Sequence, residues 1–184
     1  MHEYTAFLFS NKLLLEPKQQ SVQEAKINLD FKSWQSFSYE QIFDIKKCSA
    51  YDIEEFSQSE GNIPYITRTI KNNGVLRFVN THNKLNSGNS IIIGGESSIF
   101  FYQSQDFIAG SNITSLYNRK LNKFHSLFIT TIGNMEKYRF NYGRASNLQR
   151  VKELIIKLPV DSNGKPDWQF MEDYIKSLPY SINL

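Results

Sequence analysis

Hydrophobic residues along this chain fall into short runs separated by turn-forming residues. Residues 63–70 and 75–79 are two strand-like runs on either side of Asn72-Asn73-Gly74. An Asn-Gly turn supplies the positive φ angles that join two antiparallel strands, so this stretch predicts a β-hairpin. Residues 90–93 form a β-branched run that Gly94-Gly95 closes, and this pattern predicts a buried strand.

Weaker runs of the same kind predict further short elements. Residues 99–103, 107–109 and 154–158 are predicted strands. Residues 37–45 are compatible with either a strand or a short helix, and residues 53–56 with one helical turn.

Two segments have helical periodicity instead. In the first, which Asn118 or Asn122 would cap, apolar residues recur at spacings of three and four residues, at Leu121, Phe124, Leu127, Phe128 and Ile132. A second helix is predicted from about Asp167 to Leu178, where Pro179 stops it. The expected fold class is α+β: a single domain of many short strands in a twisted sheet, with a few helices.

The composition adds constraints on size and compartment. The 184 residues are 40% hydrophobic and 14% aromatic, which is enough for one core. The single cysteine, Cys48, allows no internal disulfide and fits a reducing cytoplasm. Its neighbours Lys46 and Lys47 would lower a thiol pKa, although a structural role is favoured. No apolar run approaches the ~20 residues of a membrane span, so we expect a cytoplasmic protein without membrane contact.

Charge is distributed unevenly along the sequence. Residues 61–150 hold eleven basic and three acidic residues, a net charge of +8, whereas the rest of the chain has a net charge of −5. A basic, Asn-rich middle block between acidic flanks is typical of a protein in which one surface binds a polyanion.

Residue patterns of common catalytic sites are absent. The sequence has neither the GxGxxG nor the GxxxxGK[ST] nucleotide motif, and no pair of its three histidines has zinc-ligand spacing. The acids of the basic block, Glu96, Asp106 and Glu136, match no metal-dependent nuclease motif in their spacing. We therefore expect no catalytic residue, no metal and no cofactor.

The basic block is rich in side chains that bind DNA. Arg bonds bidentately to guanine edges or phosphates, Asn and Gln bond to adenine edges, and Ser and Thr donate to phosphates. Singly, each such residue is more often a turn former or a solvated side chain. The amide candidates are Asn72, Asn73, Asn86, Asn89, Gln103, Asn112 and Asn118.

Several short motifs together resemble the target recognition domain of Type I restriction-modification specificity subunits and their Type IIB and IIG relatives. In chain order they include an aromatic entry, an IPYITRT-like strand, a Gly-rich strand, an aromatic strand, a Tyr-Gly-Arg motif, an exit strand and a Pro-Asp-Trp tail. They lie at residues 34–45, 63–69, 91–95, 100–103, 142–144, 156–159 and 166–181.

This resemblance implies a non-catalytic specificity component. It would bind one half of a bipartite double-stranded DNA target and direct a methyltransferase (modification) subunit, with a restriction subunit as a further partner. Residues 1–33 would be an N-terminal segment, 34–160 the recognition domain, and 161–184 a turn and helix that begin a spacer. One recognition domain without long spacer helices implies a half-size subunit that forms a homodimer through its C-terminal helix, or one domain of a larger protein.

Two alternatives stay open beside sequence-specific DNA binding. One is a protein–protein interaction module, with Tyr65, Phe100, Phe101 and Tyr102 at its interface. The other, less favoured, is a metal-dependent nuclease. The residues expected to contact DNA are Thr67, Arg68, Lys71, Ser97, Ser98, Gln103, Arg119, Lys120, Arg139, Tyr142 and Arg144.

Overall fold

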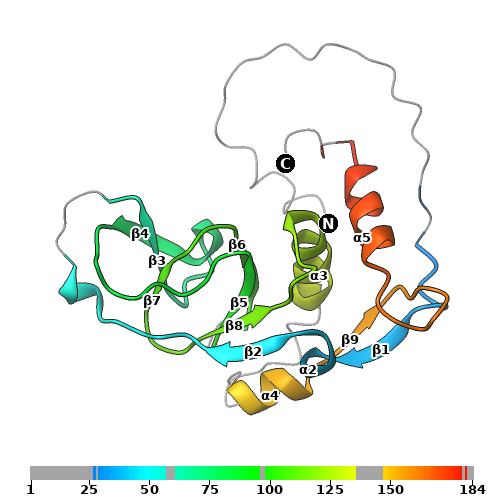
Figure 1. Ribbon diagram of the computed structural model, residues 1–184, viewed down its shortest axis with the longest axis horizontal. Coiled ribbons are helices and arrows are strands. Elements are labelled where there is room, and N and C mark those ends of the chain that lie inside the picture. The colour runs from blue at the N-terminus through cyan, green and yellow to red at the C-terminus, as the bar shows by residue number, and fades with distance from the viewer. Residues whose placement is uncertain are drawn as a thin grey trace, which may run out of the picture.

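A four-stranded antiparallel sheet lies at the centre of the computed structural model (Figure 1), which describes residues 27, 29–56, 61–95, 98–135, 147–179 and 181. Its strand order is β2-β8-β5-β6. The strands are Asp44–Lys47 (β2), Ser90–Gly94 (β5), Phe100–Gln103 (β6) and Ile113–Tyr117 (β8).

A second sheet of three strands, β4-β3-β7, packs against part of one face of the first. The predicted hairpin is confirmed: Ile63–Ile66 (β3) pairs antiparallel with Val75–Val79 (β4), although β3 ends four residues earlier than the predicted run. Its turn contains the short 3₁₀ segment Asn72–Gly74 (η3), where Asn72 and Asn73 have φ of 48° and 55°. The third strand is Ile108–Ala109 (β7), which runs parallel to β3.

The third sheet joins the beginning and the end of the described chain. Gln35–Ser38 (β1) pairs antiparallel with Ile155–Leu158 (β9), and the helix Leu148–Glu153 (α4) leads into β9. Residues 37–45 combine both alternatives that the sequence left open, because β1 is followed by the one-turn helix Tyr39–Ile42 (α2) and then by β2. The predicted helical turn is the 3₁₀ segment Ile53–Glu55 (η2).

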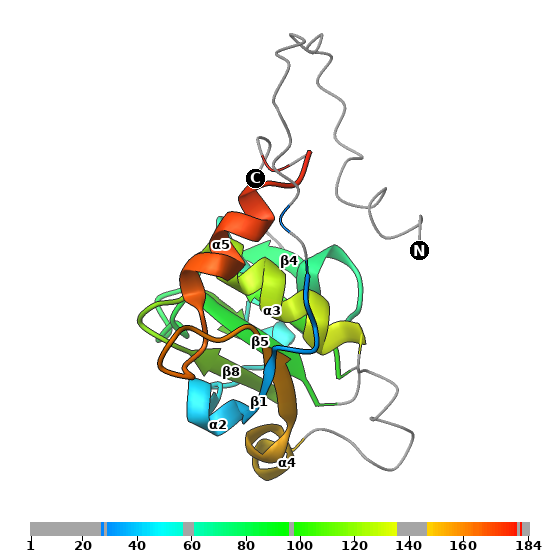
Figure 2. The ribbon, with the colours of Figure 1, turned by 90° about the vertical axis from the view of Figure 1, so that its right-hand side faces the viewer.

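Two longer helices lie side by side, and the first of them packs against β5 and β6 of the central sheet (Figures 1 and 2). They are Lys123–Met135 (α3) and Trp168–Lys176 (α5). Asn122 caps α3 by accepting a bond from the His125 backbone N–H (3.0 Å), and Asp167 caps α5 in the same way through Phe170 (2.9 Å). None of the helices in the described ranges is long and apolar enough to cross a bilayer.

Strand β5 shows how the core is arranged around the central sheet. Ile91, Ile92 and Ile93 are each at most 1% exposed, which requires both faces of the sheet to be covered. Ile91 and Ile93 face the α3 side, where they join a large cluster with Phe100, while Ile92 faces the second sheet together with Ile66. The alternation of side chains along a strand therefore places one core on each side of β5.

The expected α+β class is confirmed, with its strands divided among three sheets. Two elements were not predicted, β8 and α4. The helix α5 ends at Lys176, slightly before the predicted Leu178. Cys48 is buried, and burial raises the pKa of its thiol to about 11, which agrees with the favoured structural role.

Candidate nucleic-acid interface

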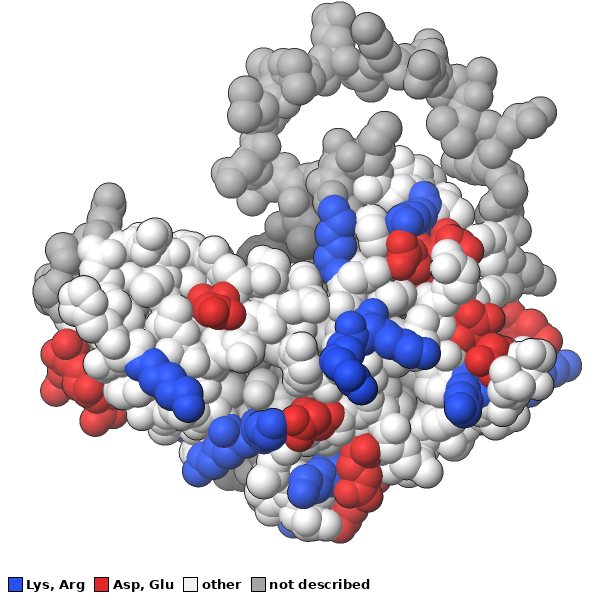
Figure 3. Space-filling model, viewed as in Figure 1, with Lys and Arg blue, Asp and Glu red and all other residues white. Residues whose placement is uncertain are grey.

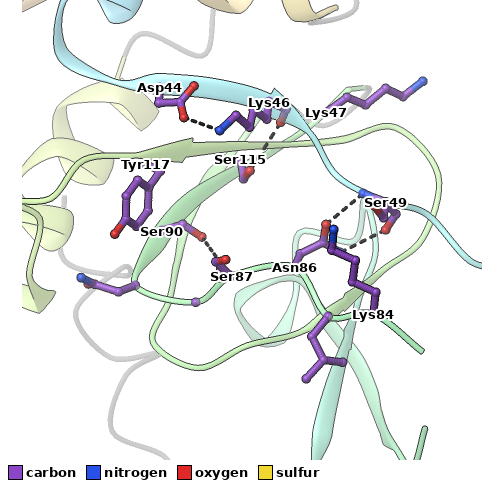
Figure 4. Close-up of a pocket in the computed structure, with 13 residues that line it drawn as sticks. Asp44, Lys46, Lys47, Ser49, Lys84, Asn86, Ser87, Ser90, Ser115 and Tyr117 are labelled. Carbon is purple, nitrogen blue, oxygen red and sulfur yellow. Dashed lines mark hydrogen bonds and ion pairs between the residues drawn. The ribbon is translucent and has the colours of Figure 1, made fainter. Parts of the chain in front are cut away.

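Within the part of the chain that the structure describes, one half of a face of the central sheet is uncovered. Side chains on alternate residues of β2 and β8 point to the same side as Cys48 and Ile113, which the second sheet buries. Beyond the edge of that second sheet, the same side presents Asp44, Lys46, Ser115 and Tyr117. These polar side chains form the floor of a groove, as the close-up in Figure 4 shows.

The groove consists of two adjoining hollows. The first has a volume of about 590 Å³ and lies between the floor and the loop 84–89. The second has a volume of about 890 Å³ and extends toward α2, the 118–120 loop and the turn before α5. Asp44 and Tyr117 line both hollows, so the two meet at this pair, whose residues are directly opposite each other in the β2–β8 register.

Basic side chains line the groove along its length. Lys46 and Lys84 line the first hollow, together with Lys47 at its rim, whose side chain points away from the hollow in Figure 4. Arg119, Lys120 and Lys165 line the second. Figure 3 shows Lys and Arg side chains in a band across the face over β2, with a few acidic side chains between them. The groove therefore combines a polar floor, six basic residues and the exposed ring of Tyr117. These features are typical of a site that binds a polyanion with planar bases.

The amide side chain of Asn86 fixes the loop that forms the wall of the first hollow. Asn86 Oδ1 accepts from the Ser49 backbone N–H (2.9 Å), and its Nδ2 donates to the Ser49 carbonyl (3.0 Å). Asn86 also exchanges two backbone hydrogen bonds with Phe107. These bonds fix the loop that carries Lys84 relative to β2, and none of them uses the Lys84 side chain.

The loop that carries Arg119 and Lys120 is held from several sides. Asn118 Nδ2 donates to the Ile42 carbonyl, and Asn89 Nδ2 donates to the Leu121 carbonyl (2.8 Å). Burial lowers the pKa of His125, and its Nδ1–H donates to the Lys120 carbonyl (2.8 Å). Such bracing presents the two cations in a fixed position, which lowers the entropic cost of binding.

Replacing Asn122 by alanine should loosen this loop. Asn122 caps α3, and its Nδ2 donates to Glu172 Oε2 on α5 (2.7 Å). Loss of the cap costs roughly 1 kcal/mol, so we expect chemical denaturation to show a decrease of about 1–2 kcal/mol in the free energy of unfolding. The matched control is Asn163→Ala in an exposed turn, which should cost less than about 0.5 kcal/mol. Equal effects of the two substitutions would contradict this account of the loop.

The asparagines of the basic block have mainly structural roles. Asn72, Asn73, Asn89 and Asn112 adopt the left-handed backbone conformation, with φ between 44° and 60°, which Asn tolerates better than most residues. Asn73 Nδ2 donates to the Tyr102 carbonyl, and Asn89 Oδ1 accepts from the Tyr102 hydroxyl. These amides are therefore engaged within the fold, which argues against their use as adenine contacts.

The residues predicted to contact DNA fall into four groups. Arg119 and Lys120 lie in the groove. Thr67, Arg68 and Lys71 lie together at the β3–β4 turn of the second sheet and line neither hollow. Ser98 is 2% exposed and Gln103 is 4% exposed, with Gln103 Nε2 donating to the Asn73 carbonyl (2.7 Å), so burial argues against direct DNA contact. The remaining four, outside the described residues, are Ser97, Arg139, Tyr142 and Arg144.

Several groove residues did not appear among the predicted ones. They are Asp44, Lys46, Lys47, Lys84, Tyr117 and Lys165. Lys46, Lys47 and Lys165 belong to the acidic flanks of the sequence, so a charge count along the chain could not group them with Arg119. The alternation of Asp44, Ile45 and Lys46 was the signal available, because it predicts a strand with one polar face.

Comparisons with known proteins agree with this fold. Residues 32–182 match the family model described as the Type I restriction modification DNA specificity domain. A curated relative, the Type II restriction enzyme specificity subunit S.BcgI of Heyndrickxia coagulans, is 32% identical over 154 residues. That alignment covers 82% of this chain and 45% of the relative, so the chain spans about half of the relative's length.

Solved structures of low sequence identity share the fold. The S subunit of a Type I restriction-modification system from M. genitalium matches with a TM-score of 0.61 and 15% identity, over 82% of this chain and 39% of that one. The HsdS subunit from Thermoanaerobacter tengcongensis matches with a TM-score of 0.55 and 10% identity, over 88% of this chain and 39% of that one. With the family model covering residues 32–182, the chain belongs to the Type I restriction modification DNA specificity domain family.

Proposed function

We propose that this chain recognises double-stranded DNA and binds one half of a bipartite target for a restriction-modification system. The observation that carries the proposal is the groove over β2 and β8, with its polar floor, Tyr117 and six cations. Membership of a DNA specificity domain family supports the same function. The groove is built on strands and braced loops, a rigid arrangement that suits the recognition of one target geometry.

Phosphate contacts should supply most of the affinity. Each phosphate that a Lys or Arg neutralises releases counterions, which contributes about 0.9 to the slope of log K against log salt on B-DNA. If all six groove cations contact phosphates, the slope should be roughly −5. Side chains that reach the edges of the base pairs would distinguish the bases. This set would include Arg139, Tyr142 and Arg144, which the sequence predicts to contact DNA and which lie outside the described residues.

Catalysis would belong to partner proteins. Over the described ranges, no three His, Cys, Asp or Glu side chains gather where a metal ion could bind. The S.BcgI relative is named a specificity subunit of a restriction enzyme, and a further structural match, with a TM-score of 0.51, concerns assembly of a Type I system. By extension we expect a methyltransferase subunit, and a restriction subunit with it, as partners of this chain.

The domain division and the homodimer remain predictions. Met171 and Ile175 of α5 pack in the same cluster as Trp34 and Phe128. Lys165 lines the groove. These contacts support a recognition domain that includes residues 161–179 in addition to 34–160. A homodimer through α5 would have to use the polar side of this helix or residues beyond it.

The residues proposed as contacts of a protein–protein interaction module pack mainly within the fold. Tyr65 is 4% exposed and Phe100 is 2% exposed, so these rings serve the core. Phe101 and Tyr102 are only half-buried, but Phe101 packs against the cluster around Ile92, and the Tyr102 hydroxyl donates to Asn89. No observation favours this second function over DNA binding.

A salt titration tests the proposal. A fluorescein-labelled 30-base-pair duplex of mixed sequence would be titrated with the chain between 50 and 200 mM salt, with anisotropy as the measurement. We expect affinity to fall by roughly a factor of a thousand over this range, as for a protein with about six phosphate contacts. Binding that is independent of salt, or its absence at 50 mM, would contradict DNA recognition by this groove.

A further inference from the structure

An acidic side chain occupies the middle of the basic groove. Asp44 begins β2, lies opposite Tyr117 in the register, and lines both hollows. Its side chain is 55% exposed, so it is available to a ligand in the groove. A carboxylate at this point repels phosphates, and on electrostatic grounds alone it weakens the binding of any polyanion.

Asp161 is a second carboxylate among the described residues of the groove, and it has a structural explanation. Asp161 Oδ1 accepts from the backbone N–H groups of Asn163 (2.8 Å) and Lys165 (3.0 Å), and these bonds close the turn before α5. Asp44 closes no turn. Its carboxylate pairs with Lys46, two residues further along the same face of β2 (Figure 4), and the Lys46 side chain is 72% exposed.

We propose, on the basis of the proposed DNA recognition, that Asp44 is a specificity-determining residue that accepts a hydrogen bond from the exocyclic N4 amine of a cytosine. Carboxylates are the side chains that pair with this amine in the major groove, where each base pair presents a distinct pattern. The exposed ion pair with Lys46 is weak, because water screens both charges. When DNA binds, a phosphate therefore attracts Lys46 away from Asp44. The Asp44 carboxylate can then accept a hydrogen bond from the edge of the cytosine, with the Tyr117 ring beside it.

An incidental carboxylate and a cytosine contact at Asp44 predict opposite changes in DNA affinity when the carboxylate is removed. An incidental carboxylate lowers the affinity for every duplex equally, so its removal strengthens binding whatever the sequence. A cytosine contact favours one base pair, so its removal weakens binding to the preferred duplex and relaxes one position. The variant for this test is Asp44→Ala, with Asp161→Asn as the charge-matched control, because the asparagine Oδ1 still accepts the bonds of the turn.

The experiment measures the affinities of the chain and both variants for the duplex that the unaltered chain prefers, selected from a randomised pool. Each C·G pair of that duplex is then changed singly. We expect Asp44→Ala to weaken binding to the preferred duplex by about tenfold and to remove the preference at one C·G pair. Asp161→Asn should keep every preference and bind all duplexes somewhat more tightly.

A uniform gain in affinity with Asp44→Ala, or retention of the preference at every C·G pair, would overturn the proposal for Asp44 while leaving DNA recognition intact. If the unaltered chain selects no duplex at all, the failure lies in the proposed function and not in the role of Asp44. The two failures are therefore distinguishable within one data set.

Discussion

Simultaneous replacement of Lys46, Lys84 and Lys120 by alanine should weaken duplex binding by about a hundredfold or more at 0.1 M salt. These residues span both hollows of the groove. Three lost phosphate contacts should also make the salt dependence shallower by roughly 2–3 units of slope. The fold should be unaffected, because the Lys120 interactions that brace its loop use its backbone N–H and carbonyl, which alanine retains.

The matched control removes three lysines elsewhere. Lys32, Lys152 and Lys157 line neither hollow, and their replacement changes the net charge by the same amount. This control should change affinity only through long-range electrostatics, which salt screens beyond about 10 Å at 0.1 M. Both triple variants would be titrated with one duplex across the same salt range. Equal losses of affinity and of slope in the two variants would show that net charge, and not the groove, governs binding.

Replacement of Phe100 by alanine should have the largest effect on stability. Phe100 is 2% exposed on β6, and its ring stacks on Tyr39 with centroids 5.4 Å apart. Phe100 also lies against Gly133 of α3. A Cβ atom added to Gly133 would be only 3.0 Å from the Phe100 Cδ2 atom, so the ring and the helix are tightly packed. Removal of such a ring costs roughly 3–5 kcal/mol, because the cavity cannot close fully.

Chemical denaturation followed by tryptophan fluorescence would measure this loss. Phe78 provides the control, since it lies on the edge strand β4 and is 48% exposed, so Phe78→Ala should cost under about 1 kcal/mol. If the two substitutions have similar costs, the junction between α3 and the central sheet is not the core described above.

Local signals in the sequence were enough to predict much of the fold. The Asn72-Asn73-Gly74 turn predicts the β3–β4 hairpin because positive φ angles are needed there, and both asparagines have them. The β-branched run at residues 90–93 predicts β5, which is buried on both faces. Apolar residues at helical spacing predict α3 correctly, and Asn122 rather than Asn118 caps it.

The candidate site could be predicted only in part, because it depends on contacts between distant segments. Arg119 and Lys120 were predicted, but Lys46 and Lys165 reach the same groove from the acidic flanks of the sequence. Strand β8, which supplies Tyr117, was missed because residues 113–117 carry a weak apolar pattern and gain their partners from β2 and β5.

The amide side chains of the basic block show the same limitation at single residues. The composition of the basic block favours Asn89 and Gln103 as adenine contacts, because amides pair with adenine edges. In the fold, each bonds to a backbone carbonyl more than twenty positions away in the chain. Residue type alone does not distinguish an amide that binds DNA from one that holds two loops together.

The most direct test of the central claim is selection of duplexes from a pool with a randomised segment by the unaltered chain, followed by sequencing of the bound fraction. Recognition through a rigid groove predicts enrichment of one short motif, and the Lys46, Lys84 and Lys120 triple variant should bind that motif with greatly reduced affinity. A folded chain that binds duplexes but enriches no motif would contradict sequence-specific recognition.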